Sequence, residues 1–467
     1  MSAVALCDVQ LYALVLKVIF QKRPAMPPPN PSDHLSVRRS FIQATAVTVA
    51  AGHLAAVSKT GLYAQLSNPS EPRRLVFGVM GLNRGKSLVE DLLKIPGVEF
   101  KYACDVDSKR AAAGAKLIAE KGGKASPIQD FREMLDDNEV DAFCCAAPNH
   151  WHGPAAILGC KAGKHVYVEK PACQNPQEGE WMVAAAEKYG KCVQVGTQRR
   201  SSPGYQAAIG KLREGAIGKV YLSRAFFNRM RGSIGTKSDA LPPSSLDYDL
   251  WQGPAPRRNY RENVLHYNWH WFWHWGNGEL GNNGVHGLDI CRWGLGVDYP
   301  MKTVSSGGRY CYQDDQETPD TQSVAWEFEG NKQITYQGLS CTQTPPGEFV
   351  SFYGSDGYLE IGTDGSYKIY DNKNKLVTET EKTSQGQFEH LTNFVEAIRA
   401  NDSKLLNQPI LSGHQSTLLC HLGNISQRSD RVIHSIASNG RPTDEGIPAG
   451  LWRREYDPKW ESRISDI

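Results

Sequence analysis

A glutamate and a lysine stand at the end of a short apolar segment, in VYVEKPACQNP, residues 166–176. The residues VYV read as a buried strand, so Glu169 and Lys170 would emerge where that strand ends. Pro171 restricts the backbone of Lys170 to an extended conformation and thereby fixes the direction of its ammonium. An ammonium held in this way can polarise a substrate oxygen or share the removal of its proton. An isolated Glu-Lys pair, however, is nearly always solvated surface.

A second candidate for chemistry is the glycine-rich turn GVMGLNRGKSL, residues 78–88, which follows an apolar segment. Glycines at such a turn let the backbone approach a pyrophosphate at the start of a helix. The match to G-x-G-x-x-G is incomplete, because Asn83 stands where the second glycine is expected and Gly85 is displaced by one residue from the third. Alone, this pattern usually indicates only a turn.

An acidic residue strengthens the case for a dinucleotide. Asp105 ends the next predicted strand, 24 positions after Gly81. A carboxylate there accepts hydrogen bonds from the adenosine ribose and repels a 2′-phosphate, so the pattern favours NAD over NADP. Arg84 keeps NADP open. The alternative role for such an acid is helix capping, for which Asp107 is the better candidate.

The elements around these residues change character along the chain. From residue 73 to about 196, short apolar runs alternate with amphipathic stretches, which predicts a parallel sheet with helices on both faces. After residue 204, long alternating strands predict a mostly antiparallel sheet, followed by two closing helices. We expect an extension with signal and linker, a nucleotide-binding domain, a substrate and oligomerisation domain, and an irregular tail, at residues 1–72, 73–200, 201–440 and 441–467.

Composition limits the classes of function. The chain has 467 residues, a formal net charge of +2 and 11 cysteines. The length suits two domains, and the near-neutral charge argues against nucleic acid as the main partner. The cysteines show neither metal-ligand nor disulfide spacing. Cys144 and Cys145 lie in an apolar run and are expected to be buried free thiols.

The N-terminal region has the features of an export signal. Arg38 and Arg39 precede a stretch, residues 40–58, whose only titratable group is His53, and a small residue follows at Ala64. This pattern predicts export by the twin-arginine route, with a periplasmic location and no membrane span. An ordinary surface helix is the alternative. Met26 would give a more typical start than Met1.

Two motifs together carry a family resemblance. AAPNHWHGPAAILGCKAGKHVYVEKPA, residues 146–172, and GNGELGNNGVHGLDICRWGLG, residues 276–296, resemble the Gfo/Idh/MocA oxidoreductases. The resemblance covers residues 73–426, and VRRSF, WQGPAP, HYNWHWFWHWGNGE and HLTNFVEAIR are similar to its exported branch. It implies a Rossmann domain, α/β with a parallel sheet, followed by an α+β domain with a large, mostly antiparallel open-faced sheet.

The resemblance also implies roles for individual residues. Lys170 would contact the reacting hydroxyl and the nicotinamide ribose, and Pro171 would follow a cis bond. The family's D-x-x-x-H pair falls on Asn282 and His286, so the histidine matches and the aspartate is replaced. Either His286 acts unaided with Lys170, or Asp289 assists it, or the redox chemistry is altered. Without the resemblance, His286 reads as a structural histidine at the start of a helix.

An aromatic segment, YNWHWFWHW, supplies candidates for binding a sugar, because tryptophan faces stack on pyranose rings. Core packing is the alternative for about half of these rings. His270 and His274 lack a third partner at helical spacing, so we expect no metal. The predicted cofactor contacts are Gly81, Asn83, Arg84, Gly85, Asp105, Asn149, His152, Glu169, Lys170 and Gln198, and the predicted substrate contacts are Arg199, Tyr267, His270 and Trp273.

Three functions remain open from the sequence. The first is an exported NAD(P)-dependent oxidoreductase that transfers a hydride to or from a sugar or sugar derivative. The second is a glycosidase that uses NAD transiently, through oxidation, elimination, water addition and re-reduction. The third is a carbohydrate-binding member of the family that has lost catalysis. The expected partners are a small carbohydrate and further copies of the chain, as a dimer or tetramer joined through the open sheet face.

Overall fold

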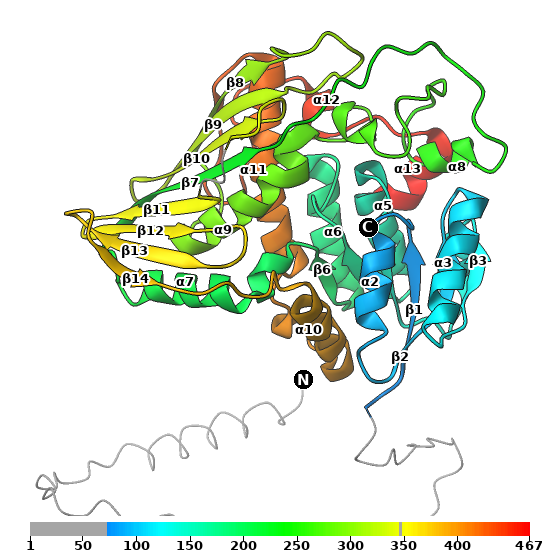
Figure 1. Ribbon diagram of the computed structural model, residues 1–467. Helices are drawn as coiled ribbons and strands as arrows, with labels where there is room; N and C mark the ends of the chain where they lie inside the picture. Colours follow the sequence, from blue (N-terminus) through cyan, green and yellow to red (C-terminus); the bar gives the residue numbers. More distant parts are fainter. Residues whose placement is uncertain (1–71, 345–347) are drawn as a thin grey trace, which may run out of the picture. The chain divides into compact units, whose positions relative to one another are not determined.

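Two sheets organise the part of the chain that the computed structural model describes, residues 72–344 and 348–467 (Figure 1). The twin-arginine segment, its cleavage site and both candidate start methionines lie outside these residues. No described helix is long and apolar enough to cross a membrane.

The first sheet has six parallel strands in the order β3-β2-β1-β4-β5-β6. The strand order reverses between β1 and β4, and ligands bind at such a switch point in open parallel sheets. The strands are β1 Leu75–Met80, β2 Val98–Cys104, β3 Ser126–Ile128, β4 Ala142–Cys145, β5 His165–Val168 and β6 Val193–Val195. The helices between them are α2 Gly85–Leu92, α3 Ser108–Glu120, α4 Arg132–Asp136, α5 Asn149–Lys161 and α6 Pro176–Tyr189.

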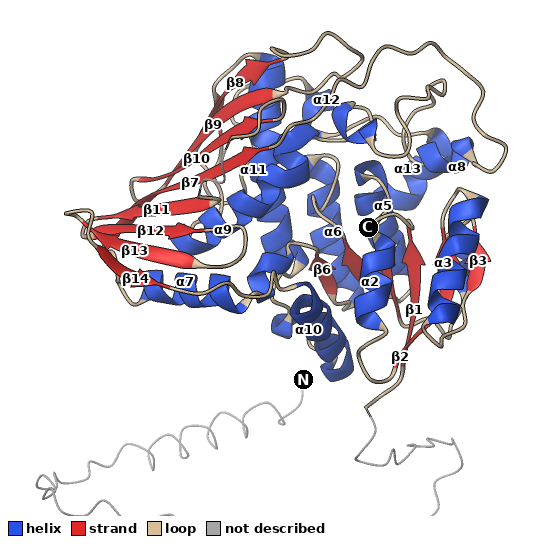
Figure 2. Ribbon diagram, viewed as in Figure 1, coloured by secondary structure: helices blue, strands red, loops and turns tan. Residues whose placement is uncertain are grey.

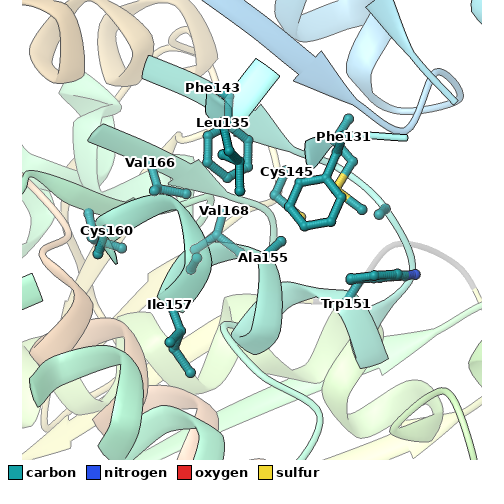
Figure 3. Packing of buried hydrophobic residues seen from close by; sticks show 14 of the residues in the cluster. Phe131, Leu135, Phe143, Cys145, Trp151, Ala155, Ile157, Cys160, Val166 and Val168 are labelled. Atoms are coloured by element: carbon teal, nitrogen blue, oxygen red, sulfur yellow. The ribbon is translucent and has the colours of Figure 1, made fainter. Parts of the chain in front are cut away.

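Both faces of this sheet are covered, as the continuous apolar strands predict. On β4 and β5, Phe143, Cys145, Val166 and Val168 face a core shared with α5, where Figure 3 shows them with Ala155 and Ile157. The intervening residues belong to a second core, which includes α10, Gln387–Ala400. The alternation of side chains along each strand therefore divides the two cores.

The second sheet has nine strands in the order β14-β13-β12-β11-β7-β10-β9-β8-β15 (Figure 2). β7 and β10 are parallel, and the other neighbours are antiparallel. The strands are β7 Val220–Asn228, β8 Lys302–Gly308, β9 Thr321–Phe328, β10 Lys332–Leu339, β11 Val350–Gly354, β12 Gly357–Ile361, β13 Tyr367–Asp371, β14 Leu376–Glu379 and β15 Ile433–His434. The predicted fold class, a Rossmann domain plus an α+β domain, is confirmed.

Helices α7, α9 and α11, at Pro203–Arg213, Val285–Leu295 and Ile410–Ser429, contribute to the core of the second sheet. Along β9, Val324, Trp326 and Phe328 are buried and the residues between them are partly exposed. The remaining elements are the 3-10 turns Gln198–Ser201, Asn268–Trp271 and Ser403–Leu405, the π-helical segment Leu280–Gly284, and helices α8 Tyr248–Gln252, α12 Ala449–Trp452 and α13 Pro458–Ser465.

The C-terminal tail differs from the prediction of an irregular segment. Residues 458–465 form α13, with Pro458 in its first turn and the Asp457 side chain accepting a hydrogen bond from the Lys459 N–H. Trp460 is buried edge-on against Trp151, with ring centroids 5.0 Å apart. The helix was missed because its two turns are too short to show a period, and its partner lies about three hundred residues earlier.

We therefore expect Trp460→Ala to destabilise the whole nucleotide-binding core, not just the tail. Loss of a buried tryptophan costs about 3–5 kcal/mol. Differential scanning calorimetry should show a lower Tm, whereas Leu241→Ala, at a side chain 92% exposed, should leave it unchanged. An unchanged Tm for Trp460→Ala would show that the tail contributes nothing to the core.

Candidate active site

A cavity of about 540 Å³ opens at the carboxyl ends of β1, β2, β4 and β5. Most of the predicted site residues lie in its wall, which they share with the segment 266–286 of the second domain. Those that line it are Gly81, Asn83, Arg84, Asp105, Asn149, His152, Glu169, Lys170, Gln198, Tyr267, His270, Asn282 and His286. Gly85, Arg199, Trp273 and Asp289 do not line it.

The glycine turn brings the backbone close to the end of β4. Gly81 has φ +90°, and a Cβ there would lie 2.5 Å from the Ala146 carbonyl oxygen. Glycine is therefore required both by the backbone conformation and by the space. Gly85 begins α2, and its Cβ would lie 2.8 Å from the Val79 side chain. It therefore lets α2 pack closely on β1, and its contact with the cofactor stays a prediction.

Asp105 is oriented by two backbone groups. Its carboxylate accepts hydrogen bonds from the Leu82 N–H at 2.8 Å and the Asp107 N–H at 3.0 Å. Burial raises the pKa of Asp105 above its ordinary value, against the effect of these two donors. Asp107 caps α3 instead, by accepting from the Lys109 N–H. The capping alternative therefore belongs to Asp107, and Asp105 remains at the cavity wall.

Glu169 is not the solvated residue that its sequence type suggests. It is buried and accepts a hydrogen bond from Arg84 Nε at 2.8 Å. Burial alone would raise the pKa of Glu169, but the charges of Arg84 and Lys170 hold it below its ordinary value. Because Arg84 is engaged by this carboxylate, it is not free to pair with a 2′-phosphate. The structure thus weakens the argument for NADP that this arginine raised.

Lys170 reaches across to the second domain. It precedes a cis bond to Pro171, as the resemblance implies, and its Nζ donates to the Asn282 carbonyl oxygen at 2.7 Å and to Asn282 Oδ1 at 3.1 Å. Burial lowers the pKa of Lys170, while the neighbouring Glu169 opposes the shift. Asn282 lies in the π-helical segment Leu280–Gly284, and such segments are frequent at functional sites. Its neutral amide gives Lys170 an acceptor without adding a charge.

His286 is a buried imidazole with an unused nitrogen. It lies in the first turn of α9, and within the described residues its Nδ1 has no hydrogen-bond partner. Burial lowers its pKa well below the ordinary value, and the charges of Arg199 and Lys170 act in the same direction. Asn282 Nδ2 and Gln198 Oε1 are likewise buried without a partner in the described chain. Buried polar atoms are normally satisfied, so this group is suited to a polar ligand.

The replacement of aspartate by Asn282 leads to a prediction about pH dependence. In Asn282→Asp, a carboxylate beside Lys170 favours the protonated ammonium and raises its pKa. Lys170 acts on the substrate oxygen in its charged form, so the loss of kcat/KM at high pH, where the ammonium gives up its proton, should move upward by about one pH unit. Asn282→Ala is the matched control, which removes the amide without adding charge and should leave the profile in place. Identical profiles for all three proteins would contradict this assignment.

Asp289 does not assist His286. Its carboxylate is buried in a pair with Arg200, with both Arg200 Nε and Nη2 at 2.8 Å, and it also accepts from Ser416 and Gln408. It therefore joins α9 to the 3-10 turn Gln198–Ser201 and to α11, away from the cavity. Asp289 was a candidate because it stands three residues after His286 in the sequence. Its pairing with Arg200 could not be foreseen from the local pattern.

Two predicted substrate residues occupy positions behind the cavity wall. The Arg199 guanidinium lies over the Phe349 ring at 4.4 Å. Trp273 carries Arg428 over its ring at 4.8 Å and donates its backbone N–H to Glu317. In its place Trp269 lines the cavity, with its ring stacked on His270 at a centroid distance of 3.6 Å.

The other aromatic and polar residues divide between binding and support. Trp271 and Trp275 are buried, which agrees with core packing. The two ring nitrogens of His152 lie 2.6 and 2.8 Å from the Pro171 and Ala147 carbonyl oxygens, so this histidine holds the turn after Lys170. Asn149 is held by Asn277 at 2.9 Å. The described residues contain no group of three or more His, Cys, Asp or Glu that could hold a metal.

Several cavity residues were not among the predicted contacts. Arg110, Arg229, Trp251, His266 and Asn283 also line the wall. Trp251 arrives there because residues 245–247 pair with the loop after β2, through Ser108 N–H to Ser245 O and Asp247 N–H to Val106 O, both 2.9 Å. Only this long-range contact places it.

Comparison with known proteins agrees with this geometry. Residues 75–197 match the family model described as the oxidoreductase family, NAD-binding Rossmann fold, and residues 227–445 match its C-terminal alpha/beta domain. The chain belongs to the Gfo/Idh/MocA family of oxidoreductases. The Gly81 turn and the Asp105 carboxylate at the cavity wall fit the NAD of this family's Rossmann domain.

Individual members of the family share only limited sequence identity with this chain. Levoglucosan dehydrogenase of Pseudarthrobacter phenanthrenivorans is 27% identical over 42% of this chain and 44% of its own length. The scyllo-inositol 2-dehydrogenase (NAD+) of Bacillus subtilis is 25% identical over 65% of this chain and 75% of its own. The matches span about half the length of the first two curated relatives, 48% and 44%.

Solved structures show the same fold. A complex of levoglucosan dehydrogenase with NADH and levoglucosan superimposes with a TM-score of 0.61, at 17% identity, over 78% of this chain and 99% of that one. At this identity the likeness is one of fold.

Proposed function

We propose that this protein is an NAD-dependent oxidoreductase that acts on a CH–OH group of a sugar or polyol. One observation carries the proposal: the Lys170 ammonium and the unpartnered His286 imidazole lie in the same cavity as the Gly81 turn and Asp105. A nucleotide-binding turn and two proton-handling groups therefore line one cavity. Named relatives that act on inositol and levoglucosan support the substrate class.

The residues fit NAD in a defined way. The Gly81 turn would hold the pyrophosphate, and Asp105 would accept the adenosine ribose hydroxyls. NAD, when bound, supplies the acceptor for the hydride that leaves the alcohol carbon. Trp269, His270 and Tyr267 would form the wall against which the sugar ring packs.

The chain's own groups then handle the hydroxyl proton. Lys170, held by Asn282, would bind the substrate oxygen and stabilise the negative charge that develops on it. Because burial and nearby cations keep the His286 imidazole neutral, this ring is able to accept the proton at neutral pH. Arg84 and Glu169 neutralise each other behind Lys170, so Lys170 keeps its charge directed at the substrate oxygen.

Asp105 should decide between the two nicotinamide cofactors. In Asp105→Ser the repulsion of a 2′-phosphate disappears, and Arg110 of the same wall can then approach it. We expect the preference for NAD over NADP to fall by about 10- to 100-fold in Kd, measured by fluorescence titration of each reduced cofactor. Asn83→Ser, in the glycine turn itself, should leave the ratio of the two Kd values unchanged. A ratio insensitive to Asp105 would place the ribose elsewhere.

The oxidoreductase proposal is tested by identifying the small molecule that denaturation releases from the purified protein, and then by adding polyols and glycosides to the intact protein. Released NAD(H) and a lasting absorbance change at the NADH band support it. Bound nucleotide with aglycone release and no lasting change would favour the glycosidase alternative. A protein that neither contains nor binds nucleotide would be a carbohydrate-binding member instead.

Export and assembly are separate proposals. The Arg38-Arg39 motif supports twin-arginine export to the periplasm, which cell fractionation of Arg38→Lys combined with Arg39→Lys would test. Cytoplasmic retention of this double variant is the expected result.

The half-exposed face of the second sheet supports a dimer or tetramer, which light scattering would test. A monomeric mass would contradict this assembly.

A further inference from the structure

We propose that Cys311 and Cys341 form a disulfide by exchange with an external disulfide, and so cross-link the two chain segments that support the aromatic wall of the cavity. Of the ten cysteines in the described residues, eight are buried, Cys311 is exposed and Cys341 is partly exposed. These two are thus the cysteines of the described residues that a dissolved reagent can reach.

The sheet brings them together. Thr321, the first residue of β9, pairs with Gly308 at the end of β8 on one side and with Leu339 at the end of β10 on the other. The chain therefore leaves β8 and β10 at the same level, and Cys311 and Cys341 follow these strand ends by three and two residues.

Asp320 holds both segments. Its carboxylate accepts the Cys311 N–H at 3.1 Å, and its backbone oxygen accepts the Ser340 N–H at 2.7 Å. Cys311 itself and the residue before Cys341 are therefore both tied to Asp320. Burial and the Cys311 thiol raise the pKa of Cys341 to about 12, so the exposed Cys311 is the sulfur that an external oxidant meets first.

The exchange has two steps. The Cys311 thiolate attacks one sulfur of the external disulfide, whose S–S bond breaks and releases one thiol. Cys341 then loses its proton and attacks the Cys311 sulfur of this mixed disulfide, which releases the second thiol. Two protein thiols are oxidised by two electrons, and the external disulfide is reduced to two thiols.

The cross-link would act on the cavity through Trp271. On the Cys311 side, the Glu317 and Thr318 N–H groups donate to the Trp271 carbonyl oxygen at 3.0 and 3.2 Å. On the Cys341 side, the Ser340 carbonyl accepts the Arg231 N–H at 2.8 Å, and the Arg231 guanidinium lies over the Trp271 ring at 4.7 Å. A bond between the two segments would therefore restrict the motion of Trp271, which is close in sequence to the cavity residues Trp269 and His270.

The test uses the full-length protein, reduced, freed of reductant and incubated with oxidised glutathione. Non-reducing digestion and mass spectrometry should find the peptides of Cys311 and Cys341 joined, with two hydrogens lost. The oxidised protein should unfold about 3 °C above the reduced one. Glutathione that stays on Cys311 of the wild type, a Cys311–Cys311 link between chains, or no modification at all would each overturn the proposal.

Two single variants separate the steps. Cys341→Ser removes the resolving thiol, so Cys311 should retain glutathione stably and the thermal shift should vanish. Cys311→Ser removes the exposed thiol, so Cys341 should remain unmodified over the same period. Equal glutathione uptake by both variants would contradict the order of attack.

Discussion

Lys170→Met should lower kcat by about 1,000-fold while the protein still binds NAD, because acid–base groups contribute roughly 100- to 10,000-fold. Methionine has a similar length and shape but carries neither the charge nor the proton donors that meet Asn282 and the substrate oxygen. Steady-state kinetics with a polyol that the wild type oxidises measures the loss, and titration with NADH measures cofactor binding separately.

Lys86→Met is the matched control, since Lys86 lies in α2 next to the turn but does not line the cavity. Its kinetics should equal those of the wild type. A Lys170→Met variant that keeps its kcat within a few-fold would show that Lys170 only holds the domains together through Asn282. Loss of NADH binding in the same variant would point to a cofactor-binding role instead.

His286→Gln should lower kcat by about 100-fold, because glutamine can hydrogen-bond the substrate hydroxyl but cannot take its proton. The sign of the pH effect follows from the lowered pKa of His286. A histidine whose pKa lies well below the ordinary value stays neutral as the pH falls through the ordinary value. The wild-type rate should therefore show no loss centred on the ordinary histidine pKa of about 6.5.

His274→Gln controls for the substitution, because this histidine contacts the Pro256 carbonyl and lies outside the cavity wall. Combining Lys170→Met with His286→Gln should raise the activation free energy by less than the sum of the two single increases, because both groups act on one hydroxyl. Strict additivity, or a titration near the ordinary histidine value, would contradict the shared role of these two residues.

The parts of this molecule that follow from local pattern were accessible from the sequence. The alternation of apolar strands and amphipathic helices predicted the parallel sheet, and Gly81, Asp105 and Lys170 were found because each ends a recognisable strand. The cis bond before Pro171 came from the family resemblance, and the position of His286 at the start of a helix followed from the local pattern. Buried free thiols at Cys144 and Cys145 followed from their apolar run.

What the sequence did not predict depends on contacts between distant residues. Asp289 is removed from the site by Arg200, and Arg84 is engaged by Glu169, 85 positions away. Trp251 reaches the cavity only because the segment before it pairs with the loop after β2. Trp460 turns the tail into a helix by packing on Trp151. In each case the deciding partner lies far along the chain, where no period or motif connects the two.

The most direct test follows the hydride itself. A polyol labelled with deuterium at the carbon that is oxidised should be incubated with the protein and NAD, and the mass of the nicotinamide cofactor measured after one turnover. We expect NADH that has gained one deuterium, and no labelled NADH with Lys170→Met over the same period. Conversion of the polyol with the label retained in the product or lost to water would contradict hydride transfer to NAD at this site.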